Sequence, residues 1–269
     1  MTAESRTALI TGASSGLGAA IALEMATRGW KLVIGARRTD RLAETAEKVR
    51  AQGAAAVYAG DLDVADDASV ERFFAASEET LGTADVIVNN AGASRFHWLA
   101  DTDVRSLRSE VETNLIGPMV VTHRAIAPLL AAGIEADVVM MSSDAVRRPR
   151  PGQLAYGASK AGLENYAEAL ALALEGTGIR VIKVRLGPAL SEFAMAWDLE
   201  PEATQKRTEH WAAFGLRDAR MLAQGTLGLL MPDDVARAVV QAVTQPRHML
   251  IDTIELQPSV PRRADGVSG

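Results

Sequence analysis

The sequence predicts an α/β fold with one doubly wound parallel sheet of about seven strands and helices on both faces. Two observations predict it. Short apolar runs of strand length alternate along the chain with longer helix-like stretches, which is typical of βαβ units with right-handed crossovers. The short runs are apolar at successive residues rather than at every second one, as expected for strands that are buried on both faces.

The expected elements follow one another without an internal repeat or a low-complexity linker. Strands are expected at Thr7–Thr11, Lys31–Ala36, Ala54–Tyr58, Asp85–Asn89, Ala136–Ser142, Arg180–Arg185 and His248–Ile254. Helices are expected at Leu17–Arg28, Arg41–Ala51, Ala68–Leu81, Val104–Leu130, Ala155–Leu174 and Pro232–Val243. In a doubly wound sheet the ligand crevice lies at the carboxyl ends of the strands.

One segment interrupts this alternation. Residues from about 189 to 231 lie between the sixth expected strand and the last expected helix, and we expect them to form an insertion that covers the crevice as a substrate lid. The residues from Pro258 onward are mostly polar and include two prolines and two arginines. We therefore predict a single domain over residues 1–258 and a flexible tail over residues 259–269.

The composition argues against several classes of function. The chain has 269 residues and a net charge of −6, which does not favour binding to nucleic acid or to an anionic membrane. It contains no cysteine, so disulfides, thiolate zinc sites and cysteine nucleophiles are excluded, and no spacing predicts another metal site. We expect no membrane-spanning stretch of about 18 apolar residues and no signal peptide, and we expect a cytoplasmic location.

A glycine-rich turn follows the first expected strand and opens the first expected helix. Its sequence, T-G-A-S-S-G-L-G, allows the backbone to turn tightly and approach a pyrophosphate, while the helix N-terminus offers free N–H groups. The residues expected to bind the phosphates are Gly12, Ser14, Ser15, Gly16, Leu17 and Gly18. A dinucleotide-binding, Rossmann-type sheet is therefore predicted, with a plain tight turn as the alternative.

Tyr156 and Lys160 carry the strongest chemical signal. They are four residues apart in an expected helix, so their side chains lie on one face, one turn apart. A nearby ammonium favours the phenolate and lowers the pKa of a phenol from about 10. A phenol with a lowered pKa can exchange a proton with a carbonyl or alcohol oxygen near neutral pH. The alternative is an aromatic side chain that packs in an interface.

The motifs occur together in a recognisable order. T-G-x-x-x-G-x-G begins at Thr11, N-N-A-G occupies residues 89–92, and Ser143 lies thirteen residues before the tyrosine of Y-x-x-x-K. In this order and spacing the chain resembles the short-chain dehydrogenase/reductase family over nearly its whole length. The resemblance implies hydride transfer between a nicotinamide cofactor and a carbonyl or alcohol carbon.

The resemblance also implies catalytic roles for four residues. Tyr156 would be the acid or base, and Ser143 would orient the substrate oxygen. Lys160 would lower the pKa of Tyr156 and bind the nicotinamide ribose. Asn114 matches the asparagine that holds a water molecule in a proton relay to this lysine, although alone it would be an ordinary polar residue within a helix.

The end of the second expected strand predicts which dinucleotide is bound. It reads Ile34-Gly35-Ala36-Arg37-Arg38, with arginines where an NAD site usually has an acid. Guanidinium groups suit a 2′-phosphate, so we predict NADP(H), with Arg37 as the main contact and Arg38 as the second. A solvated basic turn is the alternative. By resemblance, the remaining cofactor contacts are Asp61, Leu62, Asn89, Ala91, Gly92, Tyr156, Lys160, Gly187 and Ser191, although Pro188 follows Gly187 where the family commonly has the proline first.

The aromatic residues indicate where the substrate binds. Phe96, His97, Phe193 and Trp197 lie after the fourth strand or in the insertion, and they predict a largely apolar pocket under a lid. They could equally pack the lid against the body of the protein or against another subunit. Arg147, Arg148 and Arg150 could attract an acidic substrate, although a run of charges is usually solvated.

The leading hypothesis is an NADP(H)-dependent oxidoreductase that interconverts a ketone or aldehyde and an alcohol. One alternative is an oxidative dehydrogenase of a hydroxy acid, steroid or sugar alcohol. A more remote alternative is an NADP-sensing protein without turnover, which would be expected to lose the tyrosine or the lysine. The resemblance further implies a homodimer or homotetramer formed through the helices that contain Asn114 and Tyr156.

Overall fold

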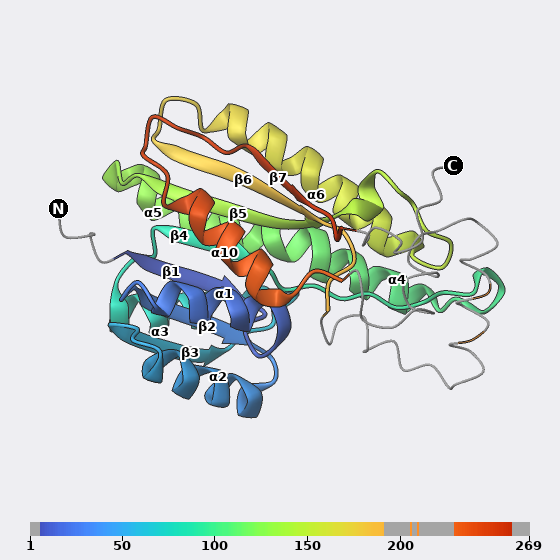
Figure 1. Cartoon of the computed structure of the whole chain (residues 1–269), viewed down its shortest axis with the longest axis horizontal. Coiled ribbons are helices and arrows are strands. Elements are labelled where there is room, and N and C mark those ends of the chain that lie inside the picture. Colours follow the sequence, from blue (N-terminus) through green and yellow to red (C-terminus); the bar gives the residue numbers. More distant parts are fainter. Residues whose placement is uncertain (1–5, 191–204, 206–208, 210–228, 260–269) are drawn as a thin grey trace, which may run out of the picture.

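The computed structural model describes residues 6–190, 205, 209 and 229–259. Seven parallel strands form one sheet in the order β3-β2-β1-β4-β5-β6-β7 (Figure 1). The strands are β1 Thr7–Thr11, β2 Lys31–Ala36, β3 Ala56–Asp61, β4 Val86–Asn89, β5 Ala136–Ser143, β6 Ile179–Leu186 and β7 Thr253–Leu256. The first three strands are added toward one side of the sheet and β4 to β7 toward the other, so the strand order reverses between β1 and β4. Ligands bind at such a switch point in open α/β sheets.

Helices cover both faces of the sheet, as predicted. The helices are α1 Gly16–Ala26, α2 Thr39–Ala51, α3 Asp67–Leu81, α4 Val104–Val111, α5 Gly117–Ala132, α6 Leu154–Ala173 and α10 Pro232–Val243. Buried side chains of α1, α2 and α10 belong to one hydrophobic cluster, and those of α3, α5 and α6 belong to a second cluster on the opposite face. Figure 1 shows α10 lying beside α1, although the two are far apart in the sequence.

The strands read as continuous apolar runs because each strand supplies both clusters. In β1, Ala8 and Ile10 enter the first cluster while Leu9 enters the second. Successive side chains of a strand point to opposite faces, so two buried faces require apolar residues at every position. Each fully buried Leu or Ile side chain contributes about 1.5–3 kcal/mol to the free energy of unfolding.

Two strands, β3 and β7, differ from their predicted ranges by more than one residue. β3 begins at Ala56 and ends at Asp61 because it pairs along the whole of β2, from Lys31 opposite Ala56 to Ala36 opposite Asp61. β7 begins only at Thr253, opposite Lys183 of β6. The Gly60-Asp61 end of β3 has low strand propensity, so strand pairing, rather than local propensity, extends the strand to Asp61.

The long helix predicted at Val104–Leu130 is interrupted near its middle. A π-helical turn, η2 Glu112–Ile116, separates α4 from α5, and Gly117 N donates to Glu112 O. Such turns inside helices occur frequently at functional sites. Asn114 lies within η2 and is fully buried.

This helical stretch bears on the expectation that no segment spans a membrane. Val104–Ala132 is long and apolar enough, by length and composition alone, to cross a membrane. Its α5 part is a covering helix of the sheet, because Val121, Ala125 and Leu129 are buried in the second cluster. Packing within the protein therefore accounts for part of the apolar composition, since 39% of the apolar window is buried.

The two ends of the predicted insertion meet at its base. Ala189 and Leu230 form an isolated parallel bridge, Leu190 N donates to Leu230 O at 2.8 Å, and Leu230 N donates to Pro188 O at 3.0 Å. Residues 191–204, 206–208 and 210–228 lie outside the described residues, as do residues 260–269 of the predicted tail.

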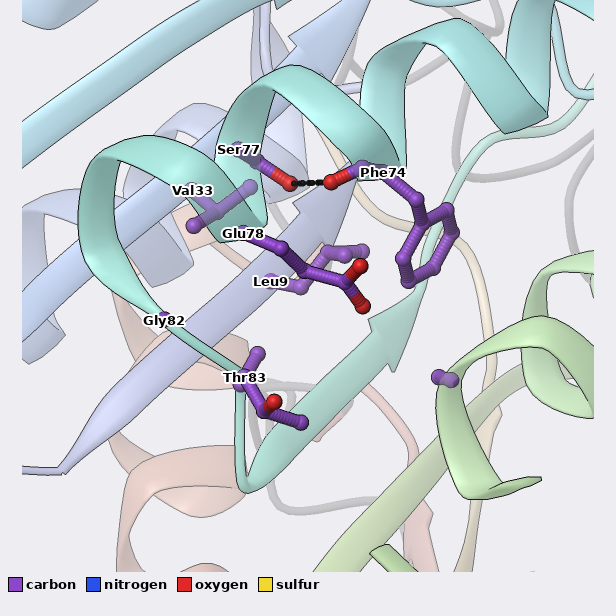
Figure 2. Close-up of a pocket in the computed structure, with 9 residues that line it drawn as sticks. Leu9, Val33, Phe74, Ser77, Glu78, Gly82 and Thr83 are labelled. Carbon is purple, nitrogen blue, oxygen red and sulfur yellow. Dashed lines mark hydrogen bonds between the residues drawn. The ribbon is translucent and has the colours of Figure 1, made fainter. Parts of the chain in front are cut away.

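Figure 2 shows a small cavity beneath α3, with Ser77 Oγ donating to Phe74 O at 3.1 Å beside it. Its lining residues are Leu9, Val33, Phe74, Ser77, Glu78, Gly82, Thr83, Ala84 and Ala125. The volume of about 10 Å³ suffices for a single water molecule. The cavity is too small for an organic ligand, and none of the predicted site residues lines it.

Candidate functional site

The glycine-rich turn has the geometry of a cradle for an anion. Gly12 and Gly16 have φ angles of 69° and 56°, a region that favours glycine. A Cβ on Gly12 would lie 2.8 Å from the Cα of Ala91, and a Cβ on Gly18 would lie 2.5 Å from Nδ2 of Asn90. The absence of these side chains therefore brings the turn into close contact with the end of β4.

Thr11 and Asn90 hold this turn in place. The Thr11 hydroxyl accepts hydrogen bonds from the N–H groups of Asn90 and Ala91, both at 3.0 Å. The Asn90 amide donates to the carbonyl oxygens of Thr11 at 2.9 Å and Gly12 at 3.2 Å. The predicted residue Asn89 points to the other face of the sheet, where its amide donates to Thr122 Oγ1 at 2.9 Å.

The cradle ends at the N-terminus of α1. Helix α1 begins at Gly16, Ser15 is its N-cap, and its first turn contains no acidic residue. The first N–H groups of a helix lack intrahelical acceptors and attract anions. Leu17 and Gly18 lie in this first turn, so the structure brings all the predicted phosphate-binding residues together.

The two arginines after β2 have different environments. Arg38 Nη2 donates to Ser15 Oγ at 2.5 Å and to Ser14 Oγ at 3.3 Å, so its guanidinium lies on the cradle. Arg37 is 66% exposed and lies 3.8 Å from an Asp63 carboxylate oxygen. The structure thus places Arg38 at the cradle, where Arg37 was expected as the main contact. Arg37 to Arg41 line an open depression of about 340 Å³.

The other predicted cofactor residues occupy varied positions. Asp61 is exposed at the end of β3, whereas Leu62 is buried and occupies the space that the absent Cβ of Gly35 leaves free. Gly92 is exposed just after β4. Gly187 packs against Gln257 and Pro258, and its N–H donates to Leu256 O at 2.8 Å. Ser191, Phe193 and Trp197 lie outside the described residues.

The four predicted catalytic residues come from three neighbouring elements. Tyr156 and Lys160 lie on α6, Ser143 ends β5, and Asn114 lies in η2. The Ser143 hydroxyl is hydrogen-bonded to the Tyr156 phenol and accepts from Ala145 N at 3.2 Å. All four residues are buried, with exposed fractions of 0–8%.

Lys160 lies beside Tyr156 but binds another group. Its Nζ is 6.0 Å from the centre of the Tyr156 ring and donates to Met141 O at 2.8 Å. Burial lowers the pKa of Lys160 to about 8. The ammonium therefore loses its proton far more easily than an exposed lysine does.

The pKa of Tyr156 is raised, which contradicts the expectation that Lys160 lowers it. Burial is the largest cause, because it disfavours the charged phenolate. The hydrogen bond to Ser143 and the charge of Arg150 oppose this rise, while the charges of Asp144 and Glu110 add to it. In this structure the phenol is therefore a protonated group at neutral pH.

Asn114 uses both ends of its amide within the protein. Oδ1 accepts from Ala93 N at 2.7 Å, and Nδ2 donates to Ala93 O at 2.7 Å and to Ser159 Oγ at 3.3 Å. The Ser159 hydroxyl donates in turn to Tyr156 O at 2.8 Å. Asn114 thus ties the segment after β4 to the catalytic turn of α6.

The three arginines considered for an acidic substrate all have acceptors nearby. Arg150 is partly buried and binds both carboxylate oxygens of Asp144, at 2.9 and 3.0 Å. Arg147 donates to Glu255 at 3.0 Å. Arg148 lies 3.5 Å from Gln257 Oε1 and 4.0 Å from an Asp144 oxygen.

The predicted pocket residues Phe96 and His97 differ in accessibility. The Phe96 ring meets Trp98 edge to face, with ring centres 4.7 Å apart. His97 is buried, and its Nε2 lies 2.6 Å from Glu110 Oε1. His97 is therefore held inside the protein rather than presented to a ligand.

Sequence reasoning missed Asn90, Glu110 and the Asp144–Arg150 pair. Strand alternation could have distinguished Asn90 from Asn89, because Asn89 shares the face of Ile87, which lies in the second cluster. Glu110 lies four residues before Asn114 on one helical face, which was a usable signal. Asp144 and Arg150 meet through a loop, and no periodicity predicts that contact.

Comparisons with known proteins identify the family. The family model for short chain dehydrogenase matches residues 6–202. Sulfoacetaldehyde reductase 2 of Chromohalobacter salexigens is 32% identical over 252 residues, which is 93% of each chain. Glycine betaine reductase ATRR of Emericella nidulans is 34% identical over 253 residues, which is 94% of this chain but only 19% of that protein's length.

A solved structure shares the whole fold. It is an alcohol dehydrogenase from the archaeon Thermococcus sibiricus, complexed with 5-hydroxy-NADP, with a TM-score of 0.77 and 27% identity. The match covers 96% of this chain and 98% of that one.

Proposed function

Because this chain belongs to the short-chain dehydrogenase/reductase family, we propose that it is an NADP(H)-dependent oxidoreductase that interconverts a carbonyl and an alcohol. The observation that carries the proposal is the contact of Ser143 with Tyr156, beside Lys160 and at the same edge of the sheet as the glycine cradle. This is an acid–base group placed next to a dinucleotide site.

The described residues fit the phosphorylated cofactor. Glycines leave the cradle open for a pyrophosphate, and an arginine, rather than an acid, faces it after β2. Arg38 would bind the 2′-phosphate with Ser14 and Ser15, and Asp61 and Lys160 would meet the adenine and the nicotinamide ribose. Bound there, the nicotinamide would supply or accept the hydride.

Tyr156 carries the proton in this mechanism. Its raised pKa keeps the phenol protonated, so during reduction it can donate a proton to the substrate oxygen. The Ser143 hydroxyl orients that oxygen by a hydrogen bond. The lowered pKa of Lys160 makes it a proton carrier near pH 8, and a protonated ammonium that turned from Met141 O toward the phenol would favour the phenolate that remains.

A two-direction activity screen tests the proposal. NADPH oxidation would be followed with sulfoacetaldehyde, betaine aldehyde, benzaldehyde and cyclohexanone, and NADP⁺ reduction with L-serine, glucose and cyclohexanol. We expect turnover of at least one compound and tighter binding of NADPH than of NADH. Binding of NADPH without turnover of a wider carbonyl panel would favour the sensing alternative, and tighter binding of NADH would overturn the cofactor assignment.

We also propose that two copies associate through α5 and α6. Leu130 and Leu172 are 42% and 68% exposed, and small residues line parts of both helices, which suits a two-fold contact. Light scattering after size-exclusion chromatography is expected to give a dimer or tetramer mass. A monomer mass at micromolar concentration would contradict this part.

A further inference from the structure

The segment after β4, residues 93–98, is held at alternate residues by side chains from one face of the helical stretch formed by α4 and η2. Asn114 binds the backbone of Ala93 twice, at 2.7 Å each. Glu110 Oε1 accepts from Arg95 N at 2.9 Å and lies 2.6 Å from His97 Nε2. Glu110 and Asn114 are four residues apart, so they share a face and together hold residues 93, 95 and 97.

The same segment is fastened on its other side to the turn before α6. His97 N donates to Gly152 O at 2.9 Å. Gly152 has a φ of 82°, and a Cβ there would overlap the ring of Phe96. Because Tyr156 lies four residues after Gly152, the position of the segment is coupled to the start of the catalytic helix.

A contribution to folding stability does not by itself explain why His97 and Glu110 are paired in the interior. Both side chains are almost sealed from solvent, with 5% and 1% exposed, and Glu110 Oε2 has no hydrogen-bond partner among the described residues. Burial raises the pKa of Glu110, which reflects the cost of a charge at this position. Replacing a buried ion pair with apolar residues is often neutral or stabilising, whereas a polar anchor can select one arrangement of an irregular segment.

We propose that Glu110, acting through His97 and the backbone of Arg95, is a positioning residue that sets where Phe96 and Trp98 lie against the turn before α6 and so determines substrate binding. The proposal rests on the proposed function, because it concerns the substrate side of the same site. Glu110 is not a catalytic residue, since its carboxylate is sealed beneath the segment. Phe96 and Trp98 lie on the alternate positions and are partly exposed, so they are the side chains that the segment can offer to a substrate.

Kinetics of Glu110→Leu and Glu110→Gln test the role. With NADPH and either benzaldehyde or sulfoacetaldehyde, Glu110→Leu is expected to raise KM for the carbonyl about tenfold, because two hydrogen bonds of the segment are lost. The kcat is expected to stay within about threefold, because the charge of Glu110 is the smallest of the causes that shift the Tyr156 pKa. A simple folding defect would instead lower apparent kcat at an unchanged KM.

Two comparisons sharpen this measurement. Glu110→Gln keeps an acceptor oxygen for Arg95 N and His97, so it is expected to restore a KM near that of the wild type. Glu112→Leu alters an exposed side chain of the same helical stretch and is the matched control, with no expected change in KM. If Glu110→Leu is not recovered as folded protein, His97→Phe is expected to raise KM in the same direction. An unchanged KM in the folded variants would overturn the proposal.

A spin label separates this inference from the proposed function. The chain has no cysteine, so Arg95→Cys carries a single nitroxide on an exposed position of the segment. We expect restricted label motion in the otherwise wild-type chain and in Glu110→Gln, and faster motion in Glu110→Leu. If the wild type reduces no carbonyl but the label moves faster in Glu110→Leu, the proposed function fails and the anchoring role stands. Equal label motion in all three chains would overturn the anchoring role, whatever the activity.

Discussion

A buried carboxylate at the amino ends of the strands is more fully paired than the ionisable groups of the candidate site at their carboxyl ends. At the amino edge, the fully buried carboxylate of Asp137 accepts hydrogen bonds from Arg6 and Arg180 at 2.7 Å and from Arg247 at 3.1 Å. The guanidinium groups of Arg6 and Arg180 also donate to backbone oxygens, including those of Val243 and Met249. These contacts join β1, β5 and β6 to the end of α10 and the loop after it.

At the carboxyl edge, buried Glu164 is likewise paired with Arg185, but three ionisable groups of the candidate site are less well compensated. The pKa of Tyr156 is raised by burial, and that of Lys160 is lowered by burial to about 8. Glu110 keeps one carboxylate oxygen without a partner among the described residues. Perturbed pKa values of this kind cluster at functional sites. The difference implies that substitutions at the amino edge change stability, whereas those at the carboxyl edge change activity.

Tyr156→Phe is expected to have the largest effect, confined to activity. Removing the phenolic hydroxyl removes the proton donor, so kcat for carbonyl reduction should fall by about 10²- to 10⁴-fold. The melting temperature should change by only a few degrees, because about one hydrogen bond is lost. Tyr166→Phe on the same helix is the matched control. Wild-type turnover in Tyr156→Phe would contradict the acid–base role.

Asp137→Asn is expected to have a comparable effect, confined to stability. Leaving three guanidinium groups around a neutral amide should lower the free energy of unfolding by about 3–5 kcal/mol, which corresponds to a fall in melting temperature of about 10 °C. The kcat per folded molecule should stay unchanged. Asp252→Asn makes the same change at a side chain that is 59% exposed, where we expect a loss below about 1 kcal/mol. Equal losses of unfolding free energy in Asp137→Asn and Asp252→Asn would contradict a special role for the buried carboxylate at the amino edge.

Lys160→Met is expected to lower activity, by less than Tyr156→Phe does, while stabilising the protein. The pKa of Lys160 is near 8 in the folded chain and 10.5 as a reference, so the penalty for its charge is absent above pH 10.5 and complete below pH 8. At pH 7 the variant should be more stable by on the order of 1–3 kcal/mol. This gain should shrink as the pH rises from 8 toward 10.5. Urea unfolding across this range measures it, and a loss of stability at pH 7 would be inconsistent with the assignment.

Arg38→Ala and Arg37→Ala are expected to have the smallest effects, limited to the cofactor. Loss of the charge-assisted contacts of Arg38 should raise the Kd for NADPH about 10- to 100-fold. Arg37→Ala should raise it less than about fivefold, because this side chain is 66% exposed and its charge is screened by solvent. The Kd for NADH should change little in either variant. Fluorescence titration gives all four constants, and a larger effect of Arg37→Ala would restore the order expected from the sequence.

Local patterns predicted the frame of the site well. Five strand ranges were predicted to within one residue at either end, and α10 was predicted with its exact bounds of Pro232–Val243. The glycine cradle and the Tyr156–Lys160 spacing were also visible. From the sequence, a cofactor contact was expected from Asn89 rather than Asn90, and a stronger one from Arg37 than from Arg38. Neighbouring residues of the same type differ only in the direction in which the backbone points their side chains. The Glu110–His97 contact was missed because it joins a helix to a loop.

The sequence by itself determined the order of strands and helices, the position of the glycines and the shared face of Tyr156 and Lys160. These depend on periodicity and backbone freedom over a few neighbouring residues. Only the tertiary structure decided the direction of the Tyr156 pKa shift, the different environments of Arg37 and Arg38, and the hydrogen bonds that hold residues 93–98. Each of these depends on burial and on contacts between distant parts of the chain, because the free energy of a charge is set by everything that surrounds it.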